Sequence, residues 1–372
     1  MAGARAGSPE QRRPGRDRPR RRPGLAQPAL PARPAAVELV AAQVRCATFQ
    51  GQQYCLHVGW TDEPAETLRA DLSGHLLRSA AAVSGKAAHT STGDLDLAAG
   101  LRATAAMSPD ARARAERREL TQAARAAAKV ADLRRTILGT GPAYAAKVGA
   151  SASPSPSPTS SPSPTISPSS TASPTTSATK SAEDYPQSGH VLKGSEMLEQ
   201  HRSYWCGPTS MQAIAWGWSG SRRSQRHWAK RLGTTTSGTS ITDIVRVVNS
   251  DTGWDKKKYA GPYVVLDIKK WSYAEWYLLM MRHIHDYRAP VVLHPILLKK
   301  YFPYLDDDAS GHYQVGRGYR QRGDKPNLLG YFEPWNQQRF DPSEPFIDRV
   351  QWRRAYLSYR ANKAHYLHNV GV

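Results

Sequence analysis

The sequence contains few cysteines and lacks a long apolar run. Its 372 residues include three cysteines, which is too few for a cysteine-rich zinc module or a dense disulfide scaffold. No window offers the ~18 apolar residues that a transmembrane helix needs. Phenylalanine is also scarce, with 5 residues against 10 tryptophans, and all but one of the tryptophans follow residue 200. Because large aromatic side chains supply core area, the packed domain is predicted to be C-terminal.

Acidic residues are outnumbered by basic ones. There are 51 Lys and Arg against 31 Asp and Glu, which gives a net charge of +20. Such an excess favours anionic partners, and we expect an anionic cell-surface polymer rather than a specific nucleic acid. No motif predicts a cofactor or a metal. The run Asp306–Asp308 lacks the alternating spacing and terminal Glu of a calcium loop.

The composition divides the chain into four segments. Residues 1–36 are rich in Arg and Pro and are predicted to be a disordered basic tail. No export signal is recognisable there, because prolines and charges interrupt the apolar stretch. Residues 37–150 form a small N-terminal region, residues 151–183 a Ser/Thr/Pro-rich disordered linker, and residues 184–372 the main domain.

Two cysteines of the N-terminal region are predicted to form a disulfide. With Gln50-Gly51 as the turn of a hairpin, Cys46 lies directly opposite Cys55, at a separation that a disulfide accepts. A stable disulfide indicates an oxidising compartment, so we expect an extracellular or cell-surface protein.

Further along the N-terminal region, the sequence predicts a long helix over residues 108–137 with Ser108 as its N-cap. Its apolar stripe is thin and consists of Leu120, Ala124, Ala127, Val130, Leu133 and Ile137.

The main domain reads as helices followed by strands. Apolar spacing predicts helices over 207–218, 241–250 and 273–287, and strands over 289–296, 312–319 and 328–335. This order favours an α+β, papain-like arrangement.

One cysteine is placed for nucleophilic chemistry. Cys206 directly precedes Gly207 and Pro208 at the start of the first predicted helix. The helix N-terminus favours a thiolate there. Gln200 lies six residues earlier and could donate its side-chain amide to the oxyanion of a tetrahedral intermediate.

A thiolate also needs a base, and the base needs an orienting partner. His312 follows Gly311 at the head of a predicted strand and is the candidate base. Glu333 at the end of the next strand could accept the second imidazole N–H, with Asn336 as the alternative. Glu333 is favoured because proline at position 334 ends the strand and because a carboxylate stabilises the imidazolium.

These residues resemble the papain-like cysteine peptidases of the bacteriocin-processing, double-glycine leader-peptidase group, in their stand-alone secreted form. The resemblance covers roughly residues 190–350 and rests on Gln200, YWCGPTS, SGHYQVGRGY and FEPWN. It implies that Cys206 is the nucleophile, His312 the base and Gln200 the oxyanion residue. Glu333 stands where the family usually has Asp. The transporter-borne members carry a membrane region and an ATP-binding domain that this chain lacks, so their leader-peptide substrate does not carry over.

The expected function is therefore hydrolysis of a peptide or protein substrate. Two alternatives remain open, a non-enzymatic cell-surface binding module on the same fold and a transglutaminase-like acyl transferase. A cell-wall amidase is disfavoured, because that group resembles Asp-Cys with a second His whereas Trp205 precedes Cys206 here.

Overall fold

The computed structural model describes residues 33–83, 93–95, 97–139, 180–256, 259–305, 308–335, 346–361 and 369–372. Residues 1–32 of the predicted tail and 151–179 of the predicted linker lie outside this part of the chain, as does Asn336.

The predicted hairpin and disulfide are present in the N-terminal region. Strands β1 (Cys46–Phe49) and β2 (Gln52–Cys55) pair antiparallel. The turn residues Gln50 and Gly51 have φ of 49° and 76°, and a type I′ turn requires positive φ at both positions. Cys46 pairs with Cys55 and is disulfide-bonded to it, with the two Cα atoms 4.0 Å apart. The register derived from the sequence is confirmed.

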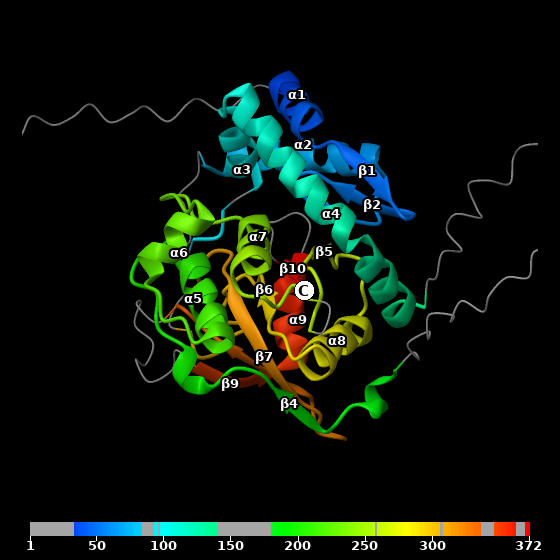
Figure 1. Cartoon of the computed structure of the whole chain (residues 1–372), viewed down its shortest axis with the longest axis vertical. Helices are drawn as coiled ribbons and strands as arrows, with labels where there is room; N and C mark the ends of the chain where they lie inside the picture. Colours follow the sequence, from blue (N-terminus) through cyan, green and yellow to red (C-terminus); the bar gives the residue numbers. More distant parts are fainter. Residues whose placement is uncertain are drawn as a thin grey trace, which may run out of the picture. The chain divides into compact units, whose positions relative to one another are not determined.

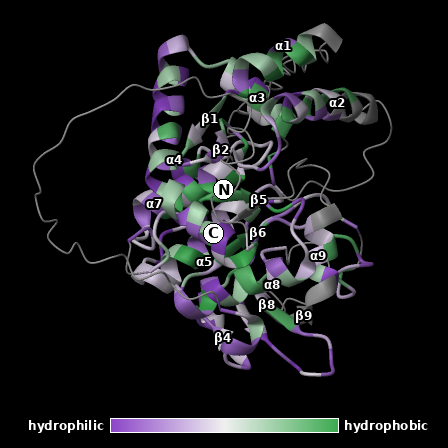
Figure 2. Cartoon of the chain, turned by 90° about the vertical axis from the view of Figure 1, so that its right-hand side faces the viewer, coloured by the Kyte–Doolittle hydropathy of each residue, from purple (hydrophilic) through white to green (hydrophobic). Residues whose placement is uncertain are grey.

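The predicted long helix is also present, as α4 (Pro109–Ile137), with the Ser108 hydroxyl accepting the Ala111 N–H. Figure 2 shows hydrophobic and hydrophilic residues alternating along α4. The buried stripe differs by one position from the prediction, because Ala123 and Ala126 are buried whereas Ala124 is exposed. The stripe packs on α8 (Tyr273–Met281).

Three further helices of this region were not predicted. They are α1 (Arg33–Gln43), α2 (Ala65–Val83) and α3 (Leu97–Ala105). The first begins inside the predicted tail. Pro34 lies in its first turn, where the missing N–H of proline costs no hydrogen bond. These helices are rich in alanine, which favours helix but leaves only a weak apolar pattern in the sequence.

The main domain begins with helices, as predicted. Helix α5 spans Cys206–Ser219, α7 spans Ile241–Asp251, and α8 continues into a π-helical turn, η4 (Arg282–Asp286). The short helix α6 (Gln225–Leu232) was not predicted, although Ser224 caps its start and Gly233, with φ of 72°, ends it. Two 3₁₀ turns, η2 (Ala182–Asp184) and η3 (Gly194–Glu196), precede α5.

The strands of the described residues form one sheet in the order β1-β2-β3-β5-β10-β6-β7-β8-β9, with β4 also paired to β7. The predicted strands are present in shorter form. Pairing is antiparallel except between β3 and β5, where Trp60 lies beside Leu266. Through this pair the hairpin joins the sheet of the main domain. The remaining bounds are β3 Gly59–Trp60, β4 Ser188–His190, β5 Val265–Asp267, β6 Val291–Leu293, β7 Gln314–Arg320, β8 Leu328–Phe332, β9 Phe346–Gln351, α9 Trp352–Ala361 and β10 Asn369–Gly371.

Helices cover both faces of the central strands. Val291 and Leu293 pack into the cluster that contains α4 and α8, whereas Val292 packs into the cluster of α5, α6 and α7. This alternation follows the two-residue period of a strand. In Figure 1, α5, α6 and α7 gather on one side of β6 and β7, with α8 and α9 on the other. The ends of β7 and β8 are thereby held between two packed layers.

Candidate active site

Cys206 is the first residue of α5 and is fully buried. Trp205 precedes the helix, and its carbonyl accepts the N–H of Thr209. Position 207, directly after Cys206, requires glycine, because a Cβ there would lie 2.7 Å from the side chain of Thr239. The Cys-Gly-Pro sequence thus lets the start of α5 lie close to the loop before α7.

The environment of the thiol favours its neutral form. Burial raises the pKa of Cys206 well above its ordinary value, and the negative charge of Asp94 raises this pKa further. Backbone hydrogen bonding at Tyr313 and Gly207 lowers the same pKa by a smaller amount. The helix N-terminus alone was expected to favour a thiolate, but in this structure burial and Asp94 outweigh it.

His312 is placed by the strand that follows it. Gly311 forms an antiparallel bridge with Ile296, and the His312 N–H donates to the carbonyl of Pro295 at 2.9 Å. Strand β7 begins at Gln314, so His312 lies just before the strand rather than as its first residue. The imidazole is fully buried. Its position is fixed by backbone pairing on both sides of the residue.

The imidazole of His312 is hydrogen-bonded to Glu333. Nε2 lies 2.7 Å from Oε1 of Glu333, which directly follows Phe332, the last residue of β8. The Trp335 N–H donates to the same oxygen at 2.9 Å. The structure thus brings His312 and Glu333 together, and the role of Glu333 as the orienting residue stays a prediction. The predicted alternative, Asn336, lies outside the described residues.

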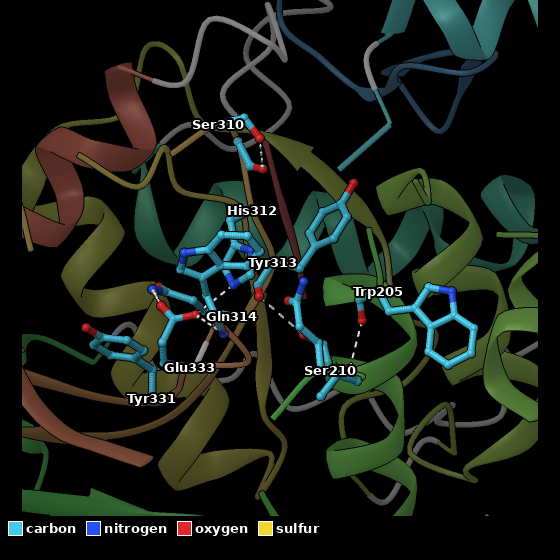
Figure 3. A network of polar contacts seen from close by, with 12 residues as sticks. Trp205, Ser210, Ser310, His312, Tyr313, Gln314, Tyr331 and Glu333 are labelled. Atoms are coloured by element: carbon cyan, nitrogen blue, oxygen red, sulfur yellow. Dashed lines mark hydrogen bonds and ion pairs between the residues drawn. The ribbon is translucent and has the colours of Figure 1, made fainter. Parts of the chain in front are cut away.

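The second oxygen of the Glu333 carboxylate is also hydrogen-bonded. Oε2 accepts from the Gln314 side-chain amide at 2.6 Å and from the Tyr304 hydroxyl at 3.3 Å. Figure 3 shows His312, Gln314 and Glu333 pointing toward one another, whereas the Trp205 indole points away. Both oxygens of this buried carboxylate therefore have hydrogen-bond donors.

The two ring nitrogens of His312 differ in their contacts. Nδ1 is buried and makes no hydrogen bond to the described residues. Because Glu333 accepts at Nε2, the hydrogen of a neutral ring lies on Nε2 and Nδ1 carries the lone pair. Within the described chain no hydrogen bond joins this ring to Cys206. The backbone of Tyr313, the residue after His312, provides the contact with the thiol.

Gln200 anchors the loop that leads to Cys206. Its backbone N–H donates to the carbonyl of Pro334, the residue after Glu333. Its side-chain amide donates to the carbonyls of Arg202 and Ser203 at 2.9 and 2.8 Å. The structure therefore brings Gln200 to the segment that carries Glu333, and its predicted role as an oxyanion donor stays a prediction.

Sequence reasoning missed several residues that surround these groups. Gln314 could have been found, because residues two apart on a strand share a face and His312 is two residues away. Tyr304 gave no signal, since it reaches Glu333 from a loop. His294 was not singled out in the sequence, yet it is buried, stacks on Tyr313 and contacts Asp94.

The fold and these residues define an α+β domain in which helices precede an antiparallel sheet and a cysteine begins the first helix. Residues 193–361 match the model of the Peptidase_C39 like family, so the chain carries a domain of that family at these positions. The family resemblance inferred from the sequence is confirmed. Membership points to a cysteine peptidase with a protein substrate. Comparison with curated proteins and with solved structures gave no match.

None of the helices in the described residues is both long enough and apolar enough to cross a membrane.

Proposed function

We propose that the chain is a cysteine peptidase in which Cys206 is the nucleophile, His312 the general base and acid, and Glu333 the residue that orients His312. One observation carries this proposal. Inside the peptidase-family domain, a buried imidazole is held by a buried carboxylate at Nε2, at a distance of 2.7 Å, while its Nδ1 has no hydrogen bond to the described residues.

The reaction follows from these roles. Nδ1 of His312 takes the proton of the Cys206 thiol, and the thiolate attacks the carbonyl carbon of the scissile peptide bond. As the C–N bond breaks, the imidazolium returns the proton to the leaving amine and a thioester remains on Cys206. His312 then deprotonates a water molecule, which attacks the thioester. As the C–S bond breaks, the acid is released and the imidazolium returns the proton to the Cys206 sulfur, which restores the free thiol. The Glu333 carboxylate holds the ring at Nε2 and stabilises the imidazolium at each step.

The oxyanion of each tetrahedral intermediate needs donors. We assign this role to the backbone N–H of Cys206, at the helix start, and to the side-chain amide of Gln200. The Gln200 amide now donates to two carbonyls of its own loop. The assignment therefore requires this amide to turn toward the substrate when a peptide binds.

The location is proposed as extracellular or cell-surface. The disulfide between Cys46 and Cys55 supports this, because such bonds persist in oxidising compartments.

The test is a peptide-library cleavage assay with the full chain. Cys206→Ala is expected to abolish cleavage without unfolding the protein, since it removes the nucleophile and one buried sulfur atom. Ser219→Ala, an exposed change at the other end of α5, is the matched control and should cleave like the wild type. Cleavage that persists in Cys206→Ala would refute the proposal. An amine acceptor in the same assay would reveal acyl transfer as a new amide product.

A further inference from the structure

A segment of the N-terminal region lies on the backbone of the loop beside Cys206. Asp94 forms a parallel bridge with Thr239. The Thr239 N–H donates to the Gly93 carbonyl at 2.9 Å, and the Leu95 N–H donates to the Thr239 carbonyl at 2.8 Å. The backbone N–H and the carbonyl of Thr239 are thus both hydrogen-bonded to the segment Gly93–Leu95. This is the pairing that an extended peptide makes when it adds to an exposed backbone edge.

Close packing places this segment at the candidate site. Thr239 lies against Gly207, the residue after Cys206. A Cβ on Gly93 would lie only 2.3 Å from the carbonyl carbon of Tyr204, two residues before Cys206. The φ of Gly93 is +107°, a value that other residues rarely adopt. The segment therefore fits between Tyr204 and Thr239 because it has a glycine at this position.

The side chain of Asp94 reinforces the backbone pairing. Its carboxylate is buried and lies 3.1 Å from Nε2 of His294. His294 stacks on Tyr313, and the Tyr313 hydroxyl donates to the Thr239 carbonyl at 3.0 Å. The same carboxylate charge raises the pKa of Cys206. A single residue of the N-terminal region is thus tied to the loop at Thr239 and also disfavours the reactive form of the thiol.

A second peptide cannot use the same backbone groups while the segment is bound. We propose that Gly93–Leu95 is an intramolecular occupant of the peptide-binding edge at Thr239, which keeps Cys206 covered and must leave before an extended peptide substrate can bind. This inference rests on the proposed peptidase function. The pairing of Gly93–Leu95 with Thr239 can nevertheless be measured without any substrate.

The experiment measures access to Cys206 in the full chain. Because the other two cysteines are disulfide-bonded, iodoacetamide reports on this thiol alone. Gly93→Ala introduces a Cβ that the site cannot hold and should accelerate labelling by at least about tenfold, equivalent to about 1.4 kcal/mol. The matched control is Gly139→Ala, at a glycine that also has positive φ but open space around it. It should label at the wild-type rate.

Two further variants separate the effect of covering Cys206 from the effect of the Asp94 charge. Asp94→Ala removes both the His294 contact and the charge, whereas Asp94→Asn keeps the shape and removes only the charge. Hydrogen exchange at the amides of Leu95 and Thr239 reports directly on the pairing. It should speed up in Gly93→Ala and in Asp94→Ala. Labelling and exchange that stay at wild-type rates in both would overturn the inference, and so would faster labelling with unchanged exchange.

Hydrolysis of the peptide library by the same variants distinguishes this inference from the proposed function. Faster labelling and exchange in Gly93→Ala without hydrolysis of any peptide would support the occupancy and refute the peptidase. Hydrolysis at equal rates in wild type and Gly93→Ala, with labelling unchanged, would refute the occupancy and leave the peptidase standing.

Discussion

The carboxylate of Glu333 offers the sharpest test of the site, through the change Glu333→Gln. One oxygen accepts from His312 and the Trp335 N–H, and the other accepts from Gln314 and Tyr304. A glutamine has an NH₂ group in place of one carboxylate oxygen. In either orientation of the side-chain amide, this NH₂ group faces hydrogen-bond donors, either those at Oε1 or those at Oε2. The buried mismatch costs about 1–3 kcal/mol of folding stability.

The effect on catalysis is expected to exceed the effect on stability. If the NH₂ group faces His312, the ring hydrogen moves to Nδ1 and the ring can no longer accept the thiol proton. The neutral side chain also stabilises the imidazolium less. By analogy with an orienting Asp made neutral, kcat/KM should fall by roughly 10²–10⁴-fold.

The assay is kcat/KM on a cleaved peptide, with thermal unfolding measured in parallel. Glu119→Gln is the matched control, because Glu119 is a partly buried glutamate that accepts from the Tyr54 hydroxyl and the His57 N–H in the N-terminal region. It should leave kcat/KM within a few fold. Asn336→Ala should be mild. A severe loss in Asn336→Ala with a mild one in Glu333→Gln would show that the orienting residue is Asn336 and would refute the reasoning.

Other parts of the molecule give three more predictions. Mass spectrometry of native protein should find a bond between Cys46 and Cys55, and finding both as free thiols would undo the argument for an extracellular location. Burial raises the pKa of Asp267 to about 7, so the wild type should gain stability as pH falls from about 7 toward 4, and Asp267→Asn should remove that dependence of the melting temperature on pH. Gly207→Ala should destabilise by about 1–3 kcal/mol through overpacking. Denaturant unfolding should show most of this cost relieved in the Thr239→Gly background, because the Cβ of Thr239 itself would lie 2.7 Å from the added Cβ, and an equal cost in both backgrounds would contradict the close approach of Gly207 to Thr239.

Local signals predicted much of the fold. The Cys46–Cys55 pairing followed from a two-residue turn, since hairpin register depends on turn length. Helix α4 followed from Ser108, which is a local capping signal. The short helix α6 and the parallel pairing of Trp60 with Leu266 did not follow, because the first is short and the second depends on contacts between residues far apart in the sequence.

The candidate site was predicted in its ionisable residues but not in its surroundings. His312 and Glu333 were found because glycine and proline mark their strand ends. The contact of Asp94 with His294 had no signal, since it joins the N-terminal region to a strand end of the main domain. For the same reason the raised pKa of the Cys206 thiol could not be foreseen from the helix N-terminus alone.

The proposed chemistry requires that Cys206 attacks a peptide carbonyl with His312 as its base. Mass spectrometry of full chain quenched in acid during turnover of a cleaved peptide observes this step itself. We predict an acyl group of the peptide's N-terminal fragment on Cys206, absent in Cys206→Ala and formed far more slowly in His312→Ala. An acyl group on another residue, or peptide cleavage that persists in Cys206→Ala, would contradict the proposed mechanism.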